Sequence, residues 1–368
     1  MKFRKVFTRK TLDATVEKLP ELAGQVPHLI AKTPAMVREL ALQATPLGRR
    51  RLALEKGALH TDDDGTGLKD LDATGVVPVP THRGDIPVRW YEVGPLDADV
   101  TVVFVHGFTL AGASWYLQFE GLRKKWPHAR LLTLDLRGHG QTGKVAPELC
   151  TVEGAADDVQ AVLNARAPKG KIVLVGHSLG GLVALNLVRR APEERYKRIT
   201  GLVLVSTSIE ELSAQGVPQV LASPIADQVR AAVESSPKQV RKLREDMAAM
   251  LAPTLAVAVF TKPTDYERIV FHAAMINDTP LETFVGFLDD LQNHEESAVA
   301  PRLQCLPGAV VVGTKDLVTP EGQADVILHM WPKASRVDVD GAGHMVILES
   351  PDEVNNAISR IIEAALAD

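Results

Sequence analysis

The chain has 368 residues, of which 45% are hydrophobic and 24% are charged. These proportions match those of soluble globular proteins and exclude disorder over most of the length, because disordered chains have far fewer apolar residues. The net charge is −5, but residues 1–60 hold 12 Lys and Arg against 5 Asp and Glu, so they carry +7 and the remainder carries −12. The first sixty residues are therefore a physically distinct segment.

The apolar residues of segment 3–56 recur at helical spacing, with Lys and Arg between them, and four prolines interrupt the pattern. The Asp- and Gly-rich residues 61–67 end it and are typical of a linker. We therefore expect residues 1–75 to form a basic helical extension. Two interpretations stay open: residues 1–60 pack on the acidic body of the protein, or they attach it peripherally to an anionic membrane.

Targeting signals and cysteines indicate in which compartment the protein is located. No stretch approaches the ~20 apolar residues of a membrane span, and no apolar run of a secretory signal follows the basic start at residues 1–10. The two cysteines, Cys150 and Cys305, are too few for a disulfide framework or a cysteine-based metal site, and we expect two buried free thiols. Together these features predict a cytoplasmic protein, with membrane association through residues 1–60 as the open alternative.

From Val76 onward, strands alternate with helices. Two β-rich runs, 76–81 and 88–93, read as a hairpin. Further strands are predicted at 100–106, 130–135, 171–176, 199–206, 309–313 and 335–340, and helices at about 113–125, 152–167, 179–190, 321–330 and 352–366. Near-continuous Val, Leu and Ile strands that alternate with helices indicate a parallel sheet covered on both faces. A largely helical insertion at about 209–304 interrupts this alternation.

The segment Gly176-His-Ser-Leu-Gly180, followed by Gly181, lies where a predicted strand gives way to a helix. A nucleophile at such a turn needs small neighbours, because the sharp change of direction crowds any larger side chain. The turn lifts the Ser178 hydroxyl above the sheet and aims the N-terminus of the next helix at it. Ser178 is therefore the candidate nucleophile. The glycines do not have the G-x-G-x-x-G spacing of a dinucleotide-binding turn.

A serine hydroxyl needs a base to activate it and an acid to orient that base. The best base is His344, just after the last strand, and the best acid is Asp316, just after the preceding one. Asp338 and Asp340 are alternative acids, but they alternate with valines and read as the outward face of a strand. The order Ser178, Asp316, His344 is the expected nucleophile–acid–base order, and residues that follow strands lie where open α/β sheets bind ligands.

A tetrahedral intermediate carries negative charge, which backbone N–H groups can stabilise. Leu179 supplies one N–H directly after the nucleophile, and Phe108, at the end of its strand, is the second candidate. Other polar residues of these loops are expected to position the site rather than to transfer protons: His106, His139, His177, Asp135 and Arg137. No metal-ligand spacing and no phosphate-binding lysine motif is present, so we expect neither a metal nor another cofactor.

Five segments together resemble the α/β-hydrolase superfamily, in its serine esterase or lipase-like branch with a helical cap. They are His106-Gly-Phe, Asp135-Leu-Arg-Gly-His-Gly140, Gly-His-Ser-Leu-Gly-Gly, Gly313-Thr-Lys-Asp316 and Gly343-His344. The resemblance covers residues 76–368 and implies a mostly parallel eight-stranded sheet with helices on both faces, preceded here by the helical extension 1–75. It implies esterase, lipase, thioesterase or related acyl-transfer chemistry. Ser178 stands where epoxide hydrolases and haloalkane dehalogenases carry aspartate.

The insertion at about 209–304 is expected to fold over the crevice as a cap. Among its apolar residues, Met275, Phe284 and Phe287 are candidate substrate contacts, together with Phe108. A large apolar cap favours a hydrophobic acyl or lipid-like substrate over a small, highly charged one. We therefore predict a serine hydrolase that cleaves hydrophobic carboxylic esters through an acyl-enzyme, with a small-molecule ester or lipid as partner and no nucleic acid.

Three alternatives to ester hydrolysis stay open. An acyltransferase would use the same three residues with an alcohol or amine in place of water. A ligand-binding member of the fold would keep the architecture without turnover. Cofactor-free peroxidase or perhydrolase activity is a further possibility that the resemblance permits. The sequence does not assign an oligomeric state.

Overall fold

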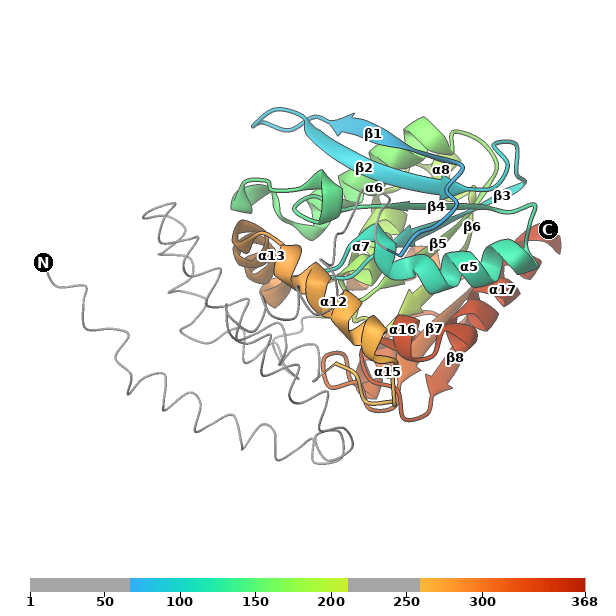
Figure 1. Cartoon of the computed structure of the whole chain (residues 1–368). Coiled ribbons are helices and arrows are strands. Elements are labelled where there is room, and N and C mark those ends of the chain that lie inside the picture. Colours follow the sequence, from blue (N-terminus) through green and yellow to red (C-terminus); the bar gives the residue numbers. More distant parts are fainter. Residues whose placement is uncertain (1–66, 211–258, 368) are drawn as a thin grey trace, which may run out of the picture. The chain divides into compact units, whose positions relative to one another are not determined.

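The computed structural model describes residues 67–210 and 259–367 of the chain (Figure 1). The expected basic extension at residues 1–60 and the first part of the expected cap lie outside the described residues. Within the described ranges, no helix is both long and apolar enough to cross a bilayer.

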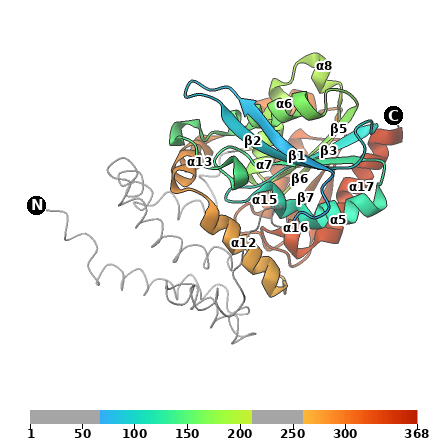
Figure 2. The same ribbon diagram turned by 45° about the horizontal axis from the view of Figure 1, so that its top comes forward.

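The described residues form an eight-stranded sheet in the order β1-β2-β4-β3-β5-β6-β7-β8 (Figures 1 and 2). Its strands are β1 (Ala73–Val79), β2 (Ile86–Val93), β3 (Val100–Val105), β4 (Arg130–Leu134), β5 (Lys171–His177), β6 (Ile199–Val205), β7 (Gly308–Gly313) and β8 (Ala334–Val339). β2 pairs antiparallel with β1 and with β4, and the other neighbouring strands are parallel. The predicted mostly parallel eight-stranded sheet is therefore confirmed.

The predicted helices of the body are also present, some with shifted ends. The helices of the described residues are α5 (Tyr116–Lys125), α6 (Val152–Arg166), α7 (Leu179–Arg190), α8 (Glu193–Tyr196), α12 (Tyr266–Asp278), α13 (Leu281–Asn293), α14 (Ala300–Leu303), α15 (Glu321–Met330), α16 (Val346–Glu349) and α17 (Pro351–Ala367), with short 3-10 turns at Gly112–Trp115, Gly140–Thr142, Pro147–Leu149 and Ser297–Val299. The four-residue helices α8, α14 and α16 were not predicted, because one turn is too short to show a period.

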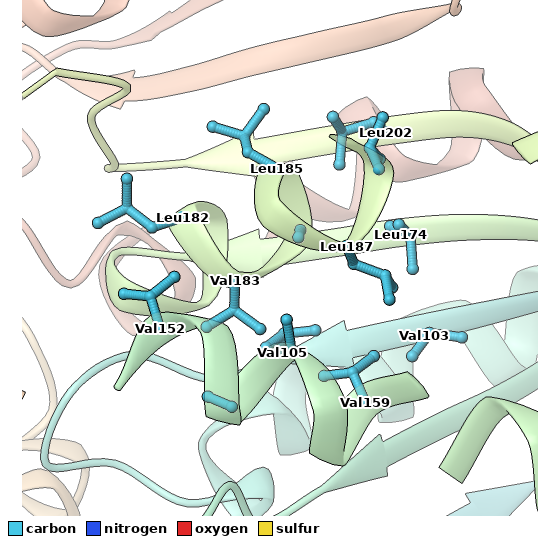
Figure 3. Packing of buried hydrophobic residues seen from close by; sticks show 14 of the residues in the cluster. Val103, Val105, Val152, Val159, Leu174, Leu182, Val183, Leu185, Leu187 and Leu202 are labelled. Atoms are coloured by element: carbon cyan, nitrogen blue, oxygen red, sulfur yellow. The ribbon is translucent and has the colours of Figure 1, made fainter. Parts of the chain in front are cut away.

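Side chains of β3 alternate between the two faces of the sheet, and helices cover both. Val103 and Val105 belong to a core cluster that also contains apolar side chains of α6 and α7 (Figure 3). Phe104, between them, points to the opposite face, where its ring lies 5.3 Å from Trp115 and 5.2 Å from Phe119. Fully burying side chains of this kind contributes about 1.5–3 kcal/mol each, so both layers stabilise the sheet that carries the loops described below.

The hairpin at the edge of the sheet begins earlier than expected. β1 starts at Ala73 rather than at Val76, because residues 73–75 pair in register with residues 90–92 of β2. The sequence pattern missed these pairs since Ala73, Thr74 and Gly75 have no apolar alternation.

The two cysteines are both free, but they differ in exposure. Cys150 is buried, and its burial raises the pKa of the thiol to about 12, which makes it unreactive. Cys305 is exposed, so the expectation of two buried thiols is wrong for this residue. It lies in the connection between α14 and β7, where no periodic pattern indicates which side chains face inward.

Candidate active site

Ser178 lies at the junction of β5 and α7 with a backbone that non-glycine residues rarely adopt, φ 53° and ψ −120°. The neighbouring glycines make this turn possible. A Cβ atom at Gly176 would collide with the backbone of Gly180, and one at Gly180 would collide with the carbonyl oxygen of Val105. The spacing of small residues around Ser178 therefore reflects the close approach of β5, α7 and β3.

Hydrogen bonds hold the strained residue in place. The Ser178 N–H donates to the carbonyl oxygen of Val205 at 3.0 Å. Its carbonyl oxygen accepts from the Gly181 N–H at 2.9 Å and from Thr207 Oγ1 at 2.7 Å. Strain of this kind costs about 1–3 kcal/mol and persists only where surrounding contacts fix it. The half-buried side chain of Ser178 is thus held at the carboxyl end of the central strand.

Asp316, after β7, and His344, after β8, form a buried hydrogen-bonded pair. The His344 Nδ1 atom lies 3.0 Å from Oδ2 and 3.2 Å from Oδ1 of Asp316. Burial raises the pKa of the Asp316 carboxyl, but the charge of His344 and hydrogen bonds from His344 and Thr319 outweigh it and hold the pKa below its usual value. The structure therefore presents an ionised carboxylate to the imidazole ring.

The two alternative acids lie elsewhere. Asp338 is exposed and binds the guanidinium of Arg336, with N–O distances of 2.7 and 2.9 Å. Asp340 is also exposed, and its Oδ1 atom accepts a long hydrogen bond of 3.5 Å from Thr314. Asp316 is thus the carboxylate that the structure brings to His344.

Thr319 is a member of this site that the sequence analysis did not identify. Its Oγ1 atom donates to Oδ2 of Asp316 at 2.8 Å and lies 3.4 Å from Nδ1 of His344. The backbone N–H groups of Val318 and Thr319 donate to Oδ1 of Asp316 at 2.8 and 3.0 Å. An aspartate that binds the backbone two and three residues ahead is a common turn, so a signal for this contact was present in the sequence.

Replacing Thr319 with valine is expected to lower kcat for ester substrates about tenfold. A hydrogen bond to a charged group contributes about 1.5–3 kcal/mol, and its loss loosens the Asp316 carboxylate against His344. Steady-state rates with a nitrophenyl ester measure the effect, and KM should change little. Thr200→Val serves as the matched control, because Thr200 lies at the start of β6, whereas Ser178 lies beside the end of that strand. Equal kcat values for the two variants would show that Thr319 does not support the pair.

The loops that carry Ser178, His344 and Gly107 meet at one end of the sheet. The ring of His177 lies 5.0 Å from that of His344, and its Nε2 atom is 3.0 Å from the His344 carbonyl oxygen. A Cβ atom at Gly107 would lie 3.2 Å from Cβ of Ser178 and 2.8 Å from Nδ1 of His177. Position 107 therefore tolerates no side chain, because the loop after β3 lies directly against the turn of Ser178.

The two candidate oxyanion donors have backbone N–H groups without an acceptor in the described part of the chain. Leu179 is the first residue of α7, and the N–H groups of a first helical turn have no partner within the helix. Phe108 lies in the loop after β3, beside Gly107. Both N–H groups are available to a negatively charged oxygen next to Ser178.

The loop that contains Phe108 is braced from the turn after β4. The Thr109 N–H donates to Nε2 of His139 at 3.2 Å, and the Gly112 N–H donates to Oδ1 of Asp135 at 2.7 Å. Arg137 differs from the prediction: its guanidinium binds Asp158 of α6, at 2.7 Å, instead of the loop. Sequence proximity to Asp135 suggested a shared role, whereas the buried carboxylate on α6 determines where the arginine points.

The three loop histidines are buried and bind backbone groups. His106 lies with Nε2 3.0 Å from the Leu136 N–H, which donates to it. Burial lowers the pKa of His139 to about 4, and burial together with the charge of His344 lowers that of His177 to about 3. Burial also lowers the pKa of His106 well below its usual range, so all three rings are neutral at ordinary pH.

Of the expected substrate contacts, three aromatic rings come together. The Phe108 ring is 5.2 Å from that of Phe284 and 6.1 Å from that of Phe287. Phe287 is fully buried and belongs to the core cluster, whereas Phe108 and Phe284 are half-buried. Met275 is buried on α12. Phe108 and Phe284 are therefore the pair that can line an apolar site.

His272 on α12 is a further residue that the sequence analysis did not single out. It is 4% exposed, its ring is 5.3 Å from that of Phe260, and its Nδ1 atom has no hydrogen-bond partner among the described residues. Burial and the charge of His344 lower its pKa to about 3, so it is neutral. Within the same described residues, no group of three or more His, Cys, Asp or Glu side chains could hold a metal ion.

A family model described as "Alpha/beta hydrolase family" matches residues 102–357, more than half of the chain. The match runs from β3 to α17 and therefore includes Phe108, Ser178, Asp316 and His344.

Relatives and solved structures also match more than two thirds of the chain. The chain is 28% identical, over 77% of its length and 68% of the relative's, to the dihydrolipoyllysine-residue acetyltransferase component of the acetoin cleaving system of Pseudomonas putida. It is 25% identical, over 68% of its length and 89% of the relative's, to the pimeloyl-[acyl-carrier protein] methyl ester esterase of Aliivibrio fischeri. A thermophilic esterase from Thermogutta terrifontis superimposes with a TM-score of 0.64 at 25% identity, covering 80% of this chain and 99% of that one.

Proposed function

Because the chain belongs to the alpha/beta hydrolase family, we propose that it is a serine hydrolase that cleaves hydrophobic carboxylic esters through an acyl-enzyme. This proposal rests on the buried pair of Asp316 and His344, in which Nδ1 of His344 lies 3.0 Å from Oδ2 of Asp316. The pair lies beside the strained turn of Ser178. The similarity to a methyl ester esterase and to a thermophilic esterase supports it. In this proposal, residues 76–368 form the catalytic body and residues 209–304 its cap.

The first half of the reaction acylates Ser178. Its Oγ atom attacks the ester carbonyl carbon while Nε2 of His344 takes the hydroxyl proton. The ionised Asp316 carboxylate holds the imidazole by Nδ1 and stabilises the imidazolium that forms. The N–H groups of Phe108 and Leu179 donate to the oxyanion, and each such donor contributes about 2.7–4 kcal/mol in related chemistry. Collapse of the intermediate expels the alcohol, which receives its proton from His344.

The second half of the reaction returns the enzyme to its starting state. A water molecule loses a proton to His344 and attacks the acyl carbonyl carbon of the Ser178 ester. The same two N–H groups bind the second oxyanion. When this intermediate collapses, the carbon–Oγ bond breaks, Ser178 regains a proton from His344, and the carboxylic acid departs.

The rings of Phe108 and Phe284 predict the acyl preference. They form an apolar surface that adjoins the proposed oxyanion donor of Phe108. Burial of one CH2 group contributes about 0.8 kcal/mol, so kcat/KM for a nitrophenyl butyrate should exceed that for the acetate about tenfold. Phe284→Ala should reduce this ratio, whereas Leu96→Ala, an exposed residue in the turn before β3, should not. A strong preference for acetate over medium and long chains would contradict a hydrophobic substrate.

Acyl transfer is the second candidate, and one observation favours it. The 28% identical relative from Pseudomonas putida bears an acetyltransferase name. The acyl-enzyme on Ser178 would then pass its acyl group to an alcohol or amine instead of water. Product analysis with a nitrophenyl ester and a competing alcohol distinguishes the two. A transfer product that exceeds the carboxylic acid at millimolar alcohol would favour the transferase, whereas acid alone would favour the hydrolase.

A further inference from the structure

A buried glutamate that the proposed reaction does not use lies beside the histidine. Glu349, the last residue of α16, is 9% exposed and follows His344 by five positions. Its Oε1 atom accepts a hydrogen bond from the Gly343 N–H at 2.9 Å. Its Oε2 atom accepts from the N–H groups of Thr261 and Lys262, at 2.9 and 2.7 Å. One carboxylate therefore joins two segments that are about eighty residues apart in the sequence.

These two segments have distinct positions in the chain. Gly343 immediately precedes His344, whereas Thr261 and Lys262 belong to the stretch that leads into the cap helix α12. Two further hydrogen bonds connect the same stretches. Thr261 Oγ1 donates to the Gly341 carbonyl oxygen at 2.7 Å, and the Met345 N–H donates to the Val259 carbonyl oxygen at 3.3 Å. The histidine loop and the stretch 259–262 are thus held as one unit.

The packing around Gly343 leaves no room for a side chain. A Cβ atom there would lie 2.5 Å from the Val259 carbonyl oxygen and 3.2 Å from Oε1 of Glu349. The Gly343 N–H belongs to the peptide unit between Ala342 and Gly343, which is one Cα atom away from the peptide unit of His344. A shift of the Glu349 carboxylate therefore reaches the backbone of His344 through a single residue.

Among the residues that the structure describes, the Glu349 carboxylate accepts hydrogen bonds from backbone N–H groups only. Burial raises the pKa of Glu349, and the three N–H donors only partly offset this, while the charge of Asp316 adds to the rise. Two cationic side chains that contact the residues on either side of Glu349 bind other groups: Lys262 Nζ donates to Ser350 Oγ at 2.7 Å, and Arg268 donates to the Leu348 carbonyl oxygen at 2.8 Å. A buried carboxylate without a cationic partner is costly, and what it provides here is directional bonding to three defined donors.

We propose that Glu349 is a positioning residue that fixes the backbone of His344 and couples it to the segment that leads into α12. The inference rests on the proposed function, in which His344 is the base. In this inference, the Glu349 side chain links the proposed cap to His344. A displacement of residues 259–262 is therefore transmitted to the imidazole ring.

Glu349→Gln tests this link, with Glu353→Gln on the exposed face of α17 as the matched control. An amide offers one acceptor oxygen and turns its NH2 group toward the N–H donors, so at least one of the three bonds is lost. A misplacement of about 1 Å can cost 10²-fold in rate, and we expect kcat to fall about 10- to 100-fold. KM should stay within about twofold, because the variant leaves the rings of Phe108 and Phe284 in place. A fluorophosphonate should still label Ser178 completely, but more slowly.

Several outcomes separate the inference from its premise. A lower melting temperature with unchanged kcat, or a raised KM with unchanged kcat, would overturn the positioning role of Glu349. A wild type without turnover or labelling would overturn the proposed function, and the inference with it. If Glu349→Gln does not fold, Thr261→Val decides, since it removes only the bond to the Gly341 carbonyl oxygen. A fall in its kcat of about threefold or more supports the coupling, and an unchanged kcat overturns it.

Discussion

Replacing Ser178 with alanine is expected to lower kcat for ester hydrolysis by about 10⁶-fold, the loss found when the nucleophile of a serine hydrolase is removed. The reason is chemical: the variant keeps His344, Asp316 and the N–H groups of Phe108 and Leu179 but cannot form the acyl-enzyme. Alanine fits the same turn, so the melting temperature should change by only a few degrees. Initial rates with nitrophenyl butyrate at micromolar enzyme measure the loss.

The matched control is Ser335→Ala, an exposed serine on β8. It removes the same hydroxyl group far from the turn of Ser178 and should leave kcat within about twofold of the wild type. Turnover by Ser178→Ala that is within about tenfold of this control would contradict Ser178 as the nucleophile.

The second large effect is expected from Asp316→Asn, which should lower kcat about 10⁴-fold. The amide has nearly the shape of the carboxylate but turns an NH2 group toward Nδ1 of His344, or toward Thr319 and the backbone donors, and so favours the wrong tautomer of the ring. The same change in serine proteases costs about 10⁴ in kcat. Rates measured from pH 5 to 9 should show the loss throughout, because Asp316, with its lowered pKa, is ionised over that whole range.

Asp338→Asn and Asp340→Asn are the controls for this prediction. Both carboxylates are exposed, and neither contacts His344. We expect kcat within about twofold of the wild type for each. If either variant lost as much kcat as Asp316→Asn, that result would contradict the assignment of Asp316 as the acid.

The sheet could be predicted because a strand that is buried on both faces is a continuous run of apolar residues in the sequence. β3, β5, β6 and β7 are apolar along nearly their whole length, and their bounds agree with the expected ones to within a residue or two. The same holds for α7 and α15, whose glycine or proline neighbours mark their first residues. Helices of four residues are too short to show such a pattern. One of them is α16, which contains Glu349.

The pair Asp316–His344 could also be predicted, because each residue directly follows a strand and neighbouring parallel strands end at one edge of the sheet. Asp338 and Asp340 could be separated from Asp316 by their alternation with valines. Local spacing was enough for these decisions, because side-chain direction in a strand has a period of two.

Contacts between distant segments could not be predicted where no motif or strand end marks the residues. Glu349 binds Thr261 and Lys262 across more than eighty residues, and His272 lies near His344 without any motif around it. The separation of Phe287, a core residue, from Phe284, a half-buried one, depends on how α13 sits on the body: Thr283 Oγ1 donates to the Gly138 carbonyl oxygen at 2.8 Å. A single sequence records the apolar character of these residues but not the surface against which each one packs.

Covalent labelling of the protein shows whether Ser178 is a nucleophile that His344 activates. The protein is treated with a fluorophosphonate, and the modified residue is identified by intact mass and peptide mapping. We predict one phosphonyl group per chain, bound to Oγ of Ser178, and labelling that His344→Ala slows by several orders of magnitude. Absence of an adduct on the folded wild type, or an adduct on another residue while Ser178 stays free, would contradict the role of Ser178 as nucleophile.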